Sequence, residues 1–115
     1  MASSCAFCRI VAREAPAEIV NESDDVLAFR DANPQASTHI LLIPKEHVPS
    51  ARDLTDHHAG VVIELMQTAA HLAKAEGVDE RGWRLLTNVG SDALQSVRHL
   101  HFHLIGGRRM GWPPG

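Results

Sequence analysis

The chain has 115 residues and a net charge of −3 with histidine counted as neutral, which suits one domain and excludes the dense basic surface of a general nucleic-acid-binding protein. Hydrophobic residues make up 44 % of the sequence but aromatic residues only 4 %, so aliphatic side chains must dominate the core. The sequence shows neither a signal-peptide pattern nor an apolar run that could cross a bilayer. We therefore expect a cytoplasmic protein without a membrane or nucleic-acid partner.

The spacing of apolar residues predicts one short helix, one long helix and five strands. Ser3 and Ser4 are placed to cap a helix over 5–13, and Thr55 is placed to cap a long helix that ends before Gly77. The strands are expected over 18–21, 26–30, 38–43, 83–87 and 98–105. Because the strands follow one another mostly in hairpin order, an α+β domain with an antiparallel sheet is favoured over a parallel βαβ array.

The last predicted strand carries three histidines at alternating positions, His99, His101 and His103. Side chains alternate along a strand, so these imidazoles share one face, and the opposite face carries Leu100, Phe102 and Leu104. Each buried imidazole brings two nitrogens that need polar partners, which makes packing alone a poor explanation. We interpret the row as a site; the alternative is a set of hydrogen-bonded histidines on a polar sheet face.

Taken with five further blocks, the histidine run resembles the histidine triad (HIT) family, in particular its Hint branch. The blocks are Leu-Ala-Phe-Arg-Asp at 27–31, Pro-Gln-Ala-Ser-Thr-His at 34–39, Ile-Pro-Lys-Glu-His at 43–47, Gln-Ser-Val at 95–97 and the ending from 106 to 115. The resemblance covers nearly the whole chain. It implies a HIT-like fold over residues 1–115, with an extended tail at 108–115 and a sheet of about five strands that continues across a two-fold homodimer.

The same resemblance implies the chemistry. In the family the middle histidine, here His101, attacks the α-phosphorus of a purine nucleoside phosphoramidate and forms a covalent nucleotidyl-histidine that water cleaves. Imidazole suits this role because it is nucleophilic when neutral, and its ordinary pKa is about 6.5. The implied supporting residues are His103 on the phosphate oxygens, His39 beside the nucleophile, and His99 and Ser96.

The implied nucleotide-binding residues lie in four parts of the chain. Asp31 would accept hydrogen bonds from the ribose hydroxyls, and Phe29 and Ile19 would line the base pocket, although core packing is the commoner fate of a strand aromatic. The loop 88–97 would hold the phosphate or the leaving group, unless it is a plain connection. The remaining implied contacts are Asn88, Gln95, Ser96, Val97, His103 and, from a tail that otherwise reads as frayed, Trp112.

One departure from the family pattern concerns the phosphate loop. Hint proteins commonly carry Gly-Gly before the Gln-Ser pair, where this chain has Ala93 and Leu94. A left-handed conformation at Leu94 would cost roughly 1–2 kcal/mol. A nucleotide-binding or interaction protein with weak turnover is therefore an alternative function.

Cys5 and Cys8 form a Cys-x-x-Cys pair, which alone could be two buried small side chains or a redox pair, though no thioredoxin-like βαβ pattern surrounds it. Some family members with this pair hold a structural zinc, and His47 and His99 would complete its Cys₂His₂ set here. Such a zinc would lie away from the nucleophile, and no organic cofactor is expected. A zinc-bound structural module is a third candidate function.

Overall fold

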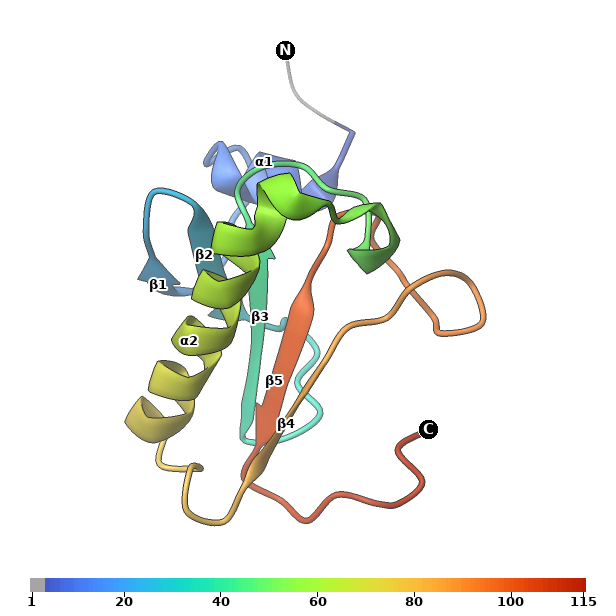
Figure 1. Cartoon of the computed structure of the whole chain (residues 1–115). Helices are drawn as coiled ribbons and strands as arrows, with labels where there is room; N and C mark the ends of the chain where they lie inside the picture. Colours follow the sequence, from blue (N-terminus) through green and yellow to red (C-terminus); the bar gives the residue numbers. More distant parts are fainter. Residues whose placement is uncertain (1–3) are drawn as a thin grey trace.

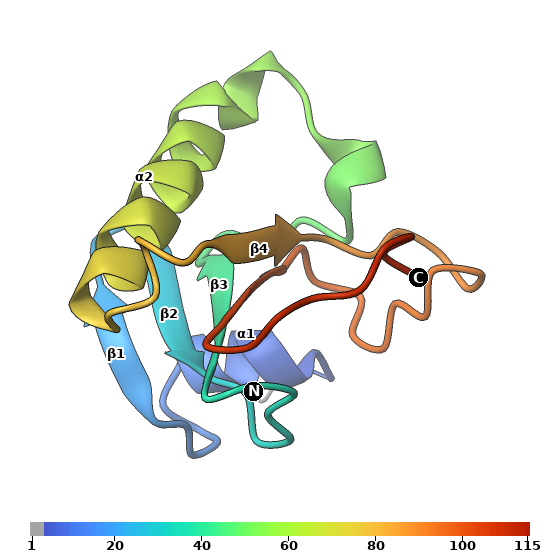
Figure 2. The ribbon, with the colours of Figure 1, turned by 90° about the horizontal axis from the view of Figure 1, so that it is seen from below.

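The computed structural model describes residues 4–115 and shows a five-stranded antiparallel sheet with one helix against each face (Figures 1 and 2). The helices are α1 (Ala6–Val11) and α2 (Ala59–Ala75), with 3₁₀ turns at Ala51–Asp53 and Asp56–His58 before α2. The strands are β1 (Ile19–Glu22), β2 (Val26–Arg30), β3 (Thr38–Pro44), β4 (Trp83–Leu86) and β5 (Phe102–Gly106). Within the described residues, no helix is long and apolar enough to cross a membrane.

The sheet order is β1-β2-β3-β5-β4, so β3 lies at the centre and β1 and β4 form the edges. The predicted α+β fold with an antiparallel sheet, one long helix and one short helix is confirmed. Its continuation across a dimer stays a prediction.

Alternation along the strands divides the core into two layers (Figure 2). On the α2 side, strand residues such as Ala28, Ile40, Leu42 and Leu104 pack with Leu65 and Ala69 of the helix. On the α1 side, Phe7 packs with Leu27, Phe29, Leu41 and Ile43. The α1 layer is the smaller one, because α1 has only 6 residues, and this leaves part of that sheet face for a site.

Both predicted helix starts need correction. Thr55 precedes the 3₁₀ turn rather than α2, and its N–H donates to Nδ1 of His58, 2.9 Å away, so the regular helix begins at Ala59. Helix α1 is capped by Cys5, whose sulfur accepts from the N–H of Cys8 at 3.4 Å. Of the predicted caps, Ser4 precedes this position and Ser3 lies outside the described residues.

Candidate functional site

The alternation predicted around the histidine triad is present, although the regular strand is shorter. Strand β5 begins at Phe102, so His99 and His101 precede it. The β3–β5 ladder stops at the pair Leu42–Phe102, and beyond that point the chain is held by the N–H of Leu100 donating to the Val48 carbonyl at 2.6 Å. The apolar partners of the histidines, Leu100, Phe102 and Leu104, all lie in the core under α2.

His101 is held in one protonation form by the backbone. Its Nδ1 lies 2.7 Å from the His99 carbonyl oxygen, and because a carbonyl only accepts, Nδ1 must carry the proton in the neutral ring. Nε2 is then bare. Within residues 4–115 every deeply buried side-chain nitrogen or oxygen has a hydrogen-bond partner, and Nε2 of His101 has none, so this atom is open to solvent although the residue is only 3 % exposed.

His103 is held by a second chain of contacts that starts at a backbone amide. The N–H of Gln35 donates to Nδ1 of His39 at 3.0 Å, which places the proton of neutral His39 on Nε2. That Nε2 lies 2.9 Å from Nδ1 of His103, so Nδ1 accepts and Nε2 of His103 carries the proton. The two triad histidines therefore offer opposite groups: a bare nitrogen on His101 and an N–H on His103, with ring centroids 5.1 Å apart.

Electrostatics keep His103 neutral. Burial lowers its pKa to about 4, and the neighbouring His101 and His39 act in the same direction, against Asp31. An Oδ2 atom of Asp31 lies 3.3 Å from Nε2 of His39 and 4.0 Å from Nδ1 of His103. Near pH 7 the His103 ring is thus a hydrogen-bonding group rather than a cation.

A cavity of about 590 Å³ opens beside these residues between α1 and the sheet. Its walls include Phe7, Phe29, Asp31, Leu41 and Ser96. Leu41 is paired with His103 across β3 and β5, which places the cavity next to the triad. Phe29 meets both of its predicted roles, because it is a core residue that also lines the cavity. Ile19 does not line it; this residue is 37 % exposed and borders an adjoining hollow.

The residues predicted to bind phosphate in the loop 88–97 lie in different environments. Ser96 lines the cavity, whereas Asn88 and Val97 are half-buried in the loop. The side-chain amide of Gln95 is used within the protein: its oxygen accepts from the N–H of Gly90 at 3.0 Å, and its nitrogen donates to the carbonyls of Pro49 and Val97 at 2.8 and 3.0 Å. Gln95 therefore shapes the loop.

The predicted strain at Leu94 is confirmed, because its φ is +62° and its side chain is 81 % exposed. Replacing Leu94 by glycine is expected to stabilise the protein by up to about 1 kcal/mol, since relief of left-handed strain outweighs the extra freedom of glycine in the unfolded chain. Urea unfolding checks this. Ala93→Gly is the matched control and should destabilise by about 0.5–1 kcal/mol, because Ala93 is not in the left-handed region. Equal effects of the two substitutions would contradict the strain argument.

The resemblance implies that Trp112 reaches the site of a partner subunit in a dimer, and this contact stays a prediction. Trp112 is 85 % exposed, and the tail is tied back at the neighbouring residue, where Arg84 donates to the Gly111 carbonyl at 3.0 Å.

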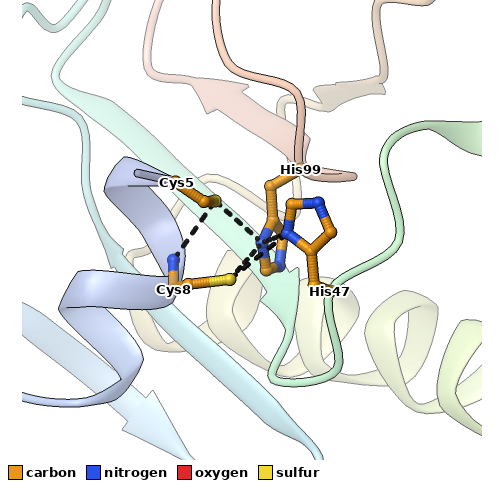
Figure 3. A group of neighbouring side chains, drawn as sticks. All are labelled: Cys5, Cys8, His47 and His99. Atoms are coloured by element: carbon orange, nitrogen blue, oxygen red, sulfur yellow. Dashed lines mark hydrogen bonds between the residues drawn. The ribbon is translucent and has the colours of Figure 1, made fainter. Parts of the chain in front are cut away.

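The four predicted metal ligands lie together, brought from α1, from the segment after β3 and from the segment before β5 (Figure 3). Nδ1 of His99 lies 3.4 and 3.5 Å from the sulfurs of Cys5 and Cys8, and Nδ1 of His47 lies 3.2 Å from Nδ1 of His99 and 3.2 Å from the Cys8 sulfur. A tetrahedral zinc with ordinary Zn–S and Zn–N bonds separates such atoms by about 3.3–3.6 Å. The spacing fits that ion.

His99 has the correct nitrogen free for such an ion. Its Nε2 lies 2.8 Å from the Pro44 carbonyl and must donate to it, so Nδ1, which points at the thiols, carries no proton. Burial also lowers the pKa of His99, which keeps the ring neutral. The Cys/His cluster is therefore a candidate zinc site. His99 connects this cluster to the triad, because its carbonyl oxygen also accepts the hydrogen bond from Nδ1 of His101.

Two features of the site escaped sequence reasoning. Phe7, a residue of α1, lies edge-on against the rings of both His99 and His101, with centroids 6.0 and 5.1 Å apart. The backbone groups of Gln35 and Pro44 determine which nitrogens carry protons. No side-chain pattern reports on such backbone contacts.

Comparisons with known proteins agree with this geometry. The HIT domain family matches residues 12–110. The chain is 47 % identical over 111 residues to a 14 kDa zinc-binding protein of Brassica juncea, covering 95 % of this chain and 97 % of that protein. It is 42 % identical over 111 residues to the purine nucleoside phosphoramidase of Escherichia coli K12, covering 96 % and 93 %. A crystal structure of a HIT family hydrolase from Legionella pneumophila matches with a TM-score of 0.95 at 47 % identity, covering 97 % of this chain and all of that one.

Proposed function

This chain belongs to the HIT family, and we propose from that premise that it hydrolyses the P–N bond of purine nucleoside 5′-phosphoramidates, using His101 as the nucleophile. The observation that carries the proposal is the pair of opposite groups on the triad: a bare, solvent-reaching Nε2 on His101 and an N–H on Nε2 of His103. The name of the phosphoramidase relative supports the substrate class.

In the proposed reaction, Nε2 of His101 forms a bond to the α-phosphorus while the P–N bond breaks, and the leaving amine takes up a proton from solvent. The phosphorylated ring gains positive charge, and the His99 carbonyl, 2.7 Å from Nδ1, stabilises that charge. The N–H of His103 donates to a phosphate oxygen, and Ser96, a residue of the cavity wall, is assigned to the phosphate or the leaving group. Water then attacks the phosphorus, the P–N bond to His101 breaks, and the nucleoside monophosphate is released.

The cavity beside the triad suits the nucleoside. Its aromatic and aliphatic walls can pack against a base, and Asp31 at its rim is a hydrogen-bond acceptor for ribose hydroxyls. One Asp31 oxygen is already bonded by the N–H of Asn33 at 2.8 Å, which holds the carboxylate in place. We assign Asp31 to the ribose and Phe29 to the base.

Intact-protein mass spectrometry tests the proposal. After brief mixing with adenosine 5′-monophosphoramidate and an acid quench, we expect an adduct of one nucleoside monophosphate on the wild type and none on His101→Ala, with ammonia and AMP formed in parallel. A protein that binds AMP but gives neither adduct nor product would overturn the hydrolase proposal. It would favour instead a nucleotide-binding protein with weak turnover, which is the second candidate because Leu94 strains the phosphate loop.

We further propose that Cys5, Cys8, His47 and His99 hold a structural zinc. When bound, zinc would supply no reaction chemistry, because four protein ligands close its coordination shell. The geometry of the cluster and the name of the zinc-binding relative support this assignment. The cluster would join the start of α1 to the segment that follows β3 and the segment that precedes β5, and so hold α1 over the cavity.

A further inference from the structure

We propose that Arg108, the first residue of the tail, is a positioning residue that keeps the proton of His39 on Nε2 and thereby keeps an N–H on Nε2 of His103. The consequence for turnover rests on the proposed function, whereas the protonation forms themselves do not. Arg108 contacts neither histidine ring through a hydrogen bond, so it acts through the turn that precedes β3.

The first step is a hydrogen bond from the tail to that turn. Nε of Arg108 donates to the carbonyl oxygen of Gln35 at 2.8 Å, and its Nη1 donates to the carbonyl of Arg109 at 3.2 Å. The second bond orients the guanidinium group. The same residue, Gln35, therefore receives a hydrogen bond from the tail at its carbonyl and gives one to His39 from its N–H.

The second step is the close approach of the Gly107 backbone to the side chain of Ser37 in the same turn. Gly106 pairs with Thr38 at the end of the β3–β5 ladder, and Gly107 continues alongside the turn with a φ of +94°. A Cβ atom at Gly107 would lie only 1.9 Å from Oγ of Ser37, so no other residue fits here without a shift. Residues 106–108 thus hold the turn at two neighbouring points, Gln35 and Ser37.

The third step concerns what the turn controls. If the N–H of Gln35 moved away, neutral His39 could carry its proton on Nδ1, and its bare Nε2 would then face Nδ1 of His103. The proton of His103 would shift to Nδ1 to restore that bond, and the N–H on Nε2 would be lost. Asp31, 3.3 Å from Nε2 of His39, also favours a proton there.

The positive charge of Arg108 also affects the protonation of His39. Burial lowers the pKa of His39, Asp31 opposes this, and the positive charge of Arg108 adds to the lowering. Arg108 therefore disfavours the imidazolium form of His39, while its hydrogen bond to Gln35 selects between the two neutral forms.

Arg108→Met tests the inference, with Arg109→Met as the matched control. Both residues are exposed neighbours in the tail, and among the described residues the side chain of Arg109 makes no hydrogen bond or ion pair. Long-range ¹H–¹⁵N spectra near pH 7.5 distinguish protonated from bare imidazole nitrogens. In the wild type and Arg109→Met we expect one set of bare Nδ1 and protonated Nε2 signals for His39 and His103. In Arg108→Met we expect both nitrogens of each ring to move toward averaged values.

Steady-state kinetics give the second readout. We expect kcat of Arg108→Met to fall about tenfold, at the low end of what proton-handling groups contribute, with little change in KM. Unchanged imidazole spectra in Arg108→Met would overturn the inference. If the spectra change as expected but the wild type has no phosphoramidase activity, the proposed function fails while the positioning role stands. A fall in kcat with wild-type spectra would mean that Arg108 acts only through the tail, which also overturns the inference.

Discussion

Replacing His101 by alanine is expected to lower kcat/KM for a nucleoside phosphoramidate by at least about a thousandfold, or roughly 4 kcal/mol of transition-state stabilisation. The loss is large because no other group in the site presents a bare nitrogen. His39 and His103 both carry their protons on Nε2, and Nδ1 of His99 points at the cysteines. Single-turnover kinetics at saturating enzyme measure the effect.

His71→Ala is the control for that result, because His71 is an exposed residue of α2, on the far side of the sheet. It should keep the wild-type rate.

Since His101 is buried, replacing it by alanine also leaves a cavity. The variant His101→Gln refills most of that volume and so separates a loss of catalysis from a loss of folding. Equilibrium binding of AMP should change little in either His101 variant. Retention of more than about a tenth of the wild-type rate would exclude His101 as the nucleophile.

Removing zinc is expected to be the largest single change in stability. At a free zinc concentration a thousand times the Kd, the ion stabilises the folded state by about 4 kcal/mol, and a domain of this size loses roughly 10–20 °C in Tm when that is withdrawn. The effect should be strong here because the cluster joins three segments that are distant in sequence: residues 5–8, His47 and His99.

Calorimetry with and without a chelator measures the effect, together with the zinc content of the purified protein. Cys8→Ser removes one ligand and should abolish both the bound zinc and the sensitivity to chelator. Wild-type protein that contains one zinc per chain yet shows the same Tm after chelation would contradict a structural role. Protein that takes up no zinc when refolded with an excess of the ion would exclude the site altogether.

Much of this architecture could be predicted because it follows from periodicity within the chain. The alternation of imidazole and aliphatic side chains from 99 to 104 indicated a strand with one face in the core, and the structure confirms which face is which. The first residue of β5 could not be predicted in this way. Its position depends on where pairing with β3 ends, at Leu42, and Leu42 lies more than fifty residues away in the sequence.

In the candidate site too, some features could be predicted from the sequence and others depend on contacts made by the fold. Residue types and the family resemblance predicted that the two cysteines and two histidines of the cluster lie together, and they drew attention to the backbone at Leu94. The protonation forms of the histidines were beyond reach, because each is decided by a backbone group that the fold brings close: the His99 carbonyl, the Pro44 carbonyl and the Gln35 amide. The start of α2 was misplaced because His58, not a regular helical turn, bonds the amide of Thr55.

The two-residue period of β5 has a consequence for how this chain can change length. A single residue inserted or deleted between Leu100 and Gly106 would rotate every following side chain to the other face, so that an imidazole would enter the aliphatic layer under α2 and a leucine would take its place on the triad face of the sheet. One such event would damage stability and chemistry together. Insertions and deletions that preserve function should therefore occur in surface loops such as 88–97 and not in the triad strand.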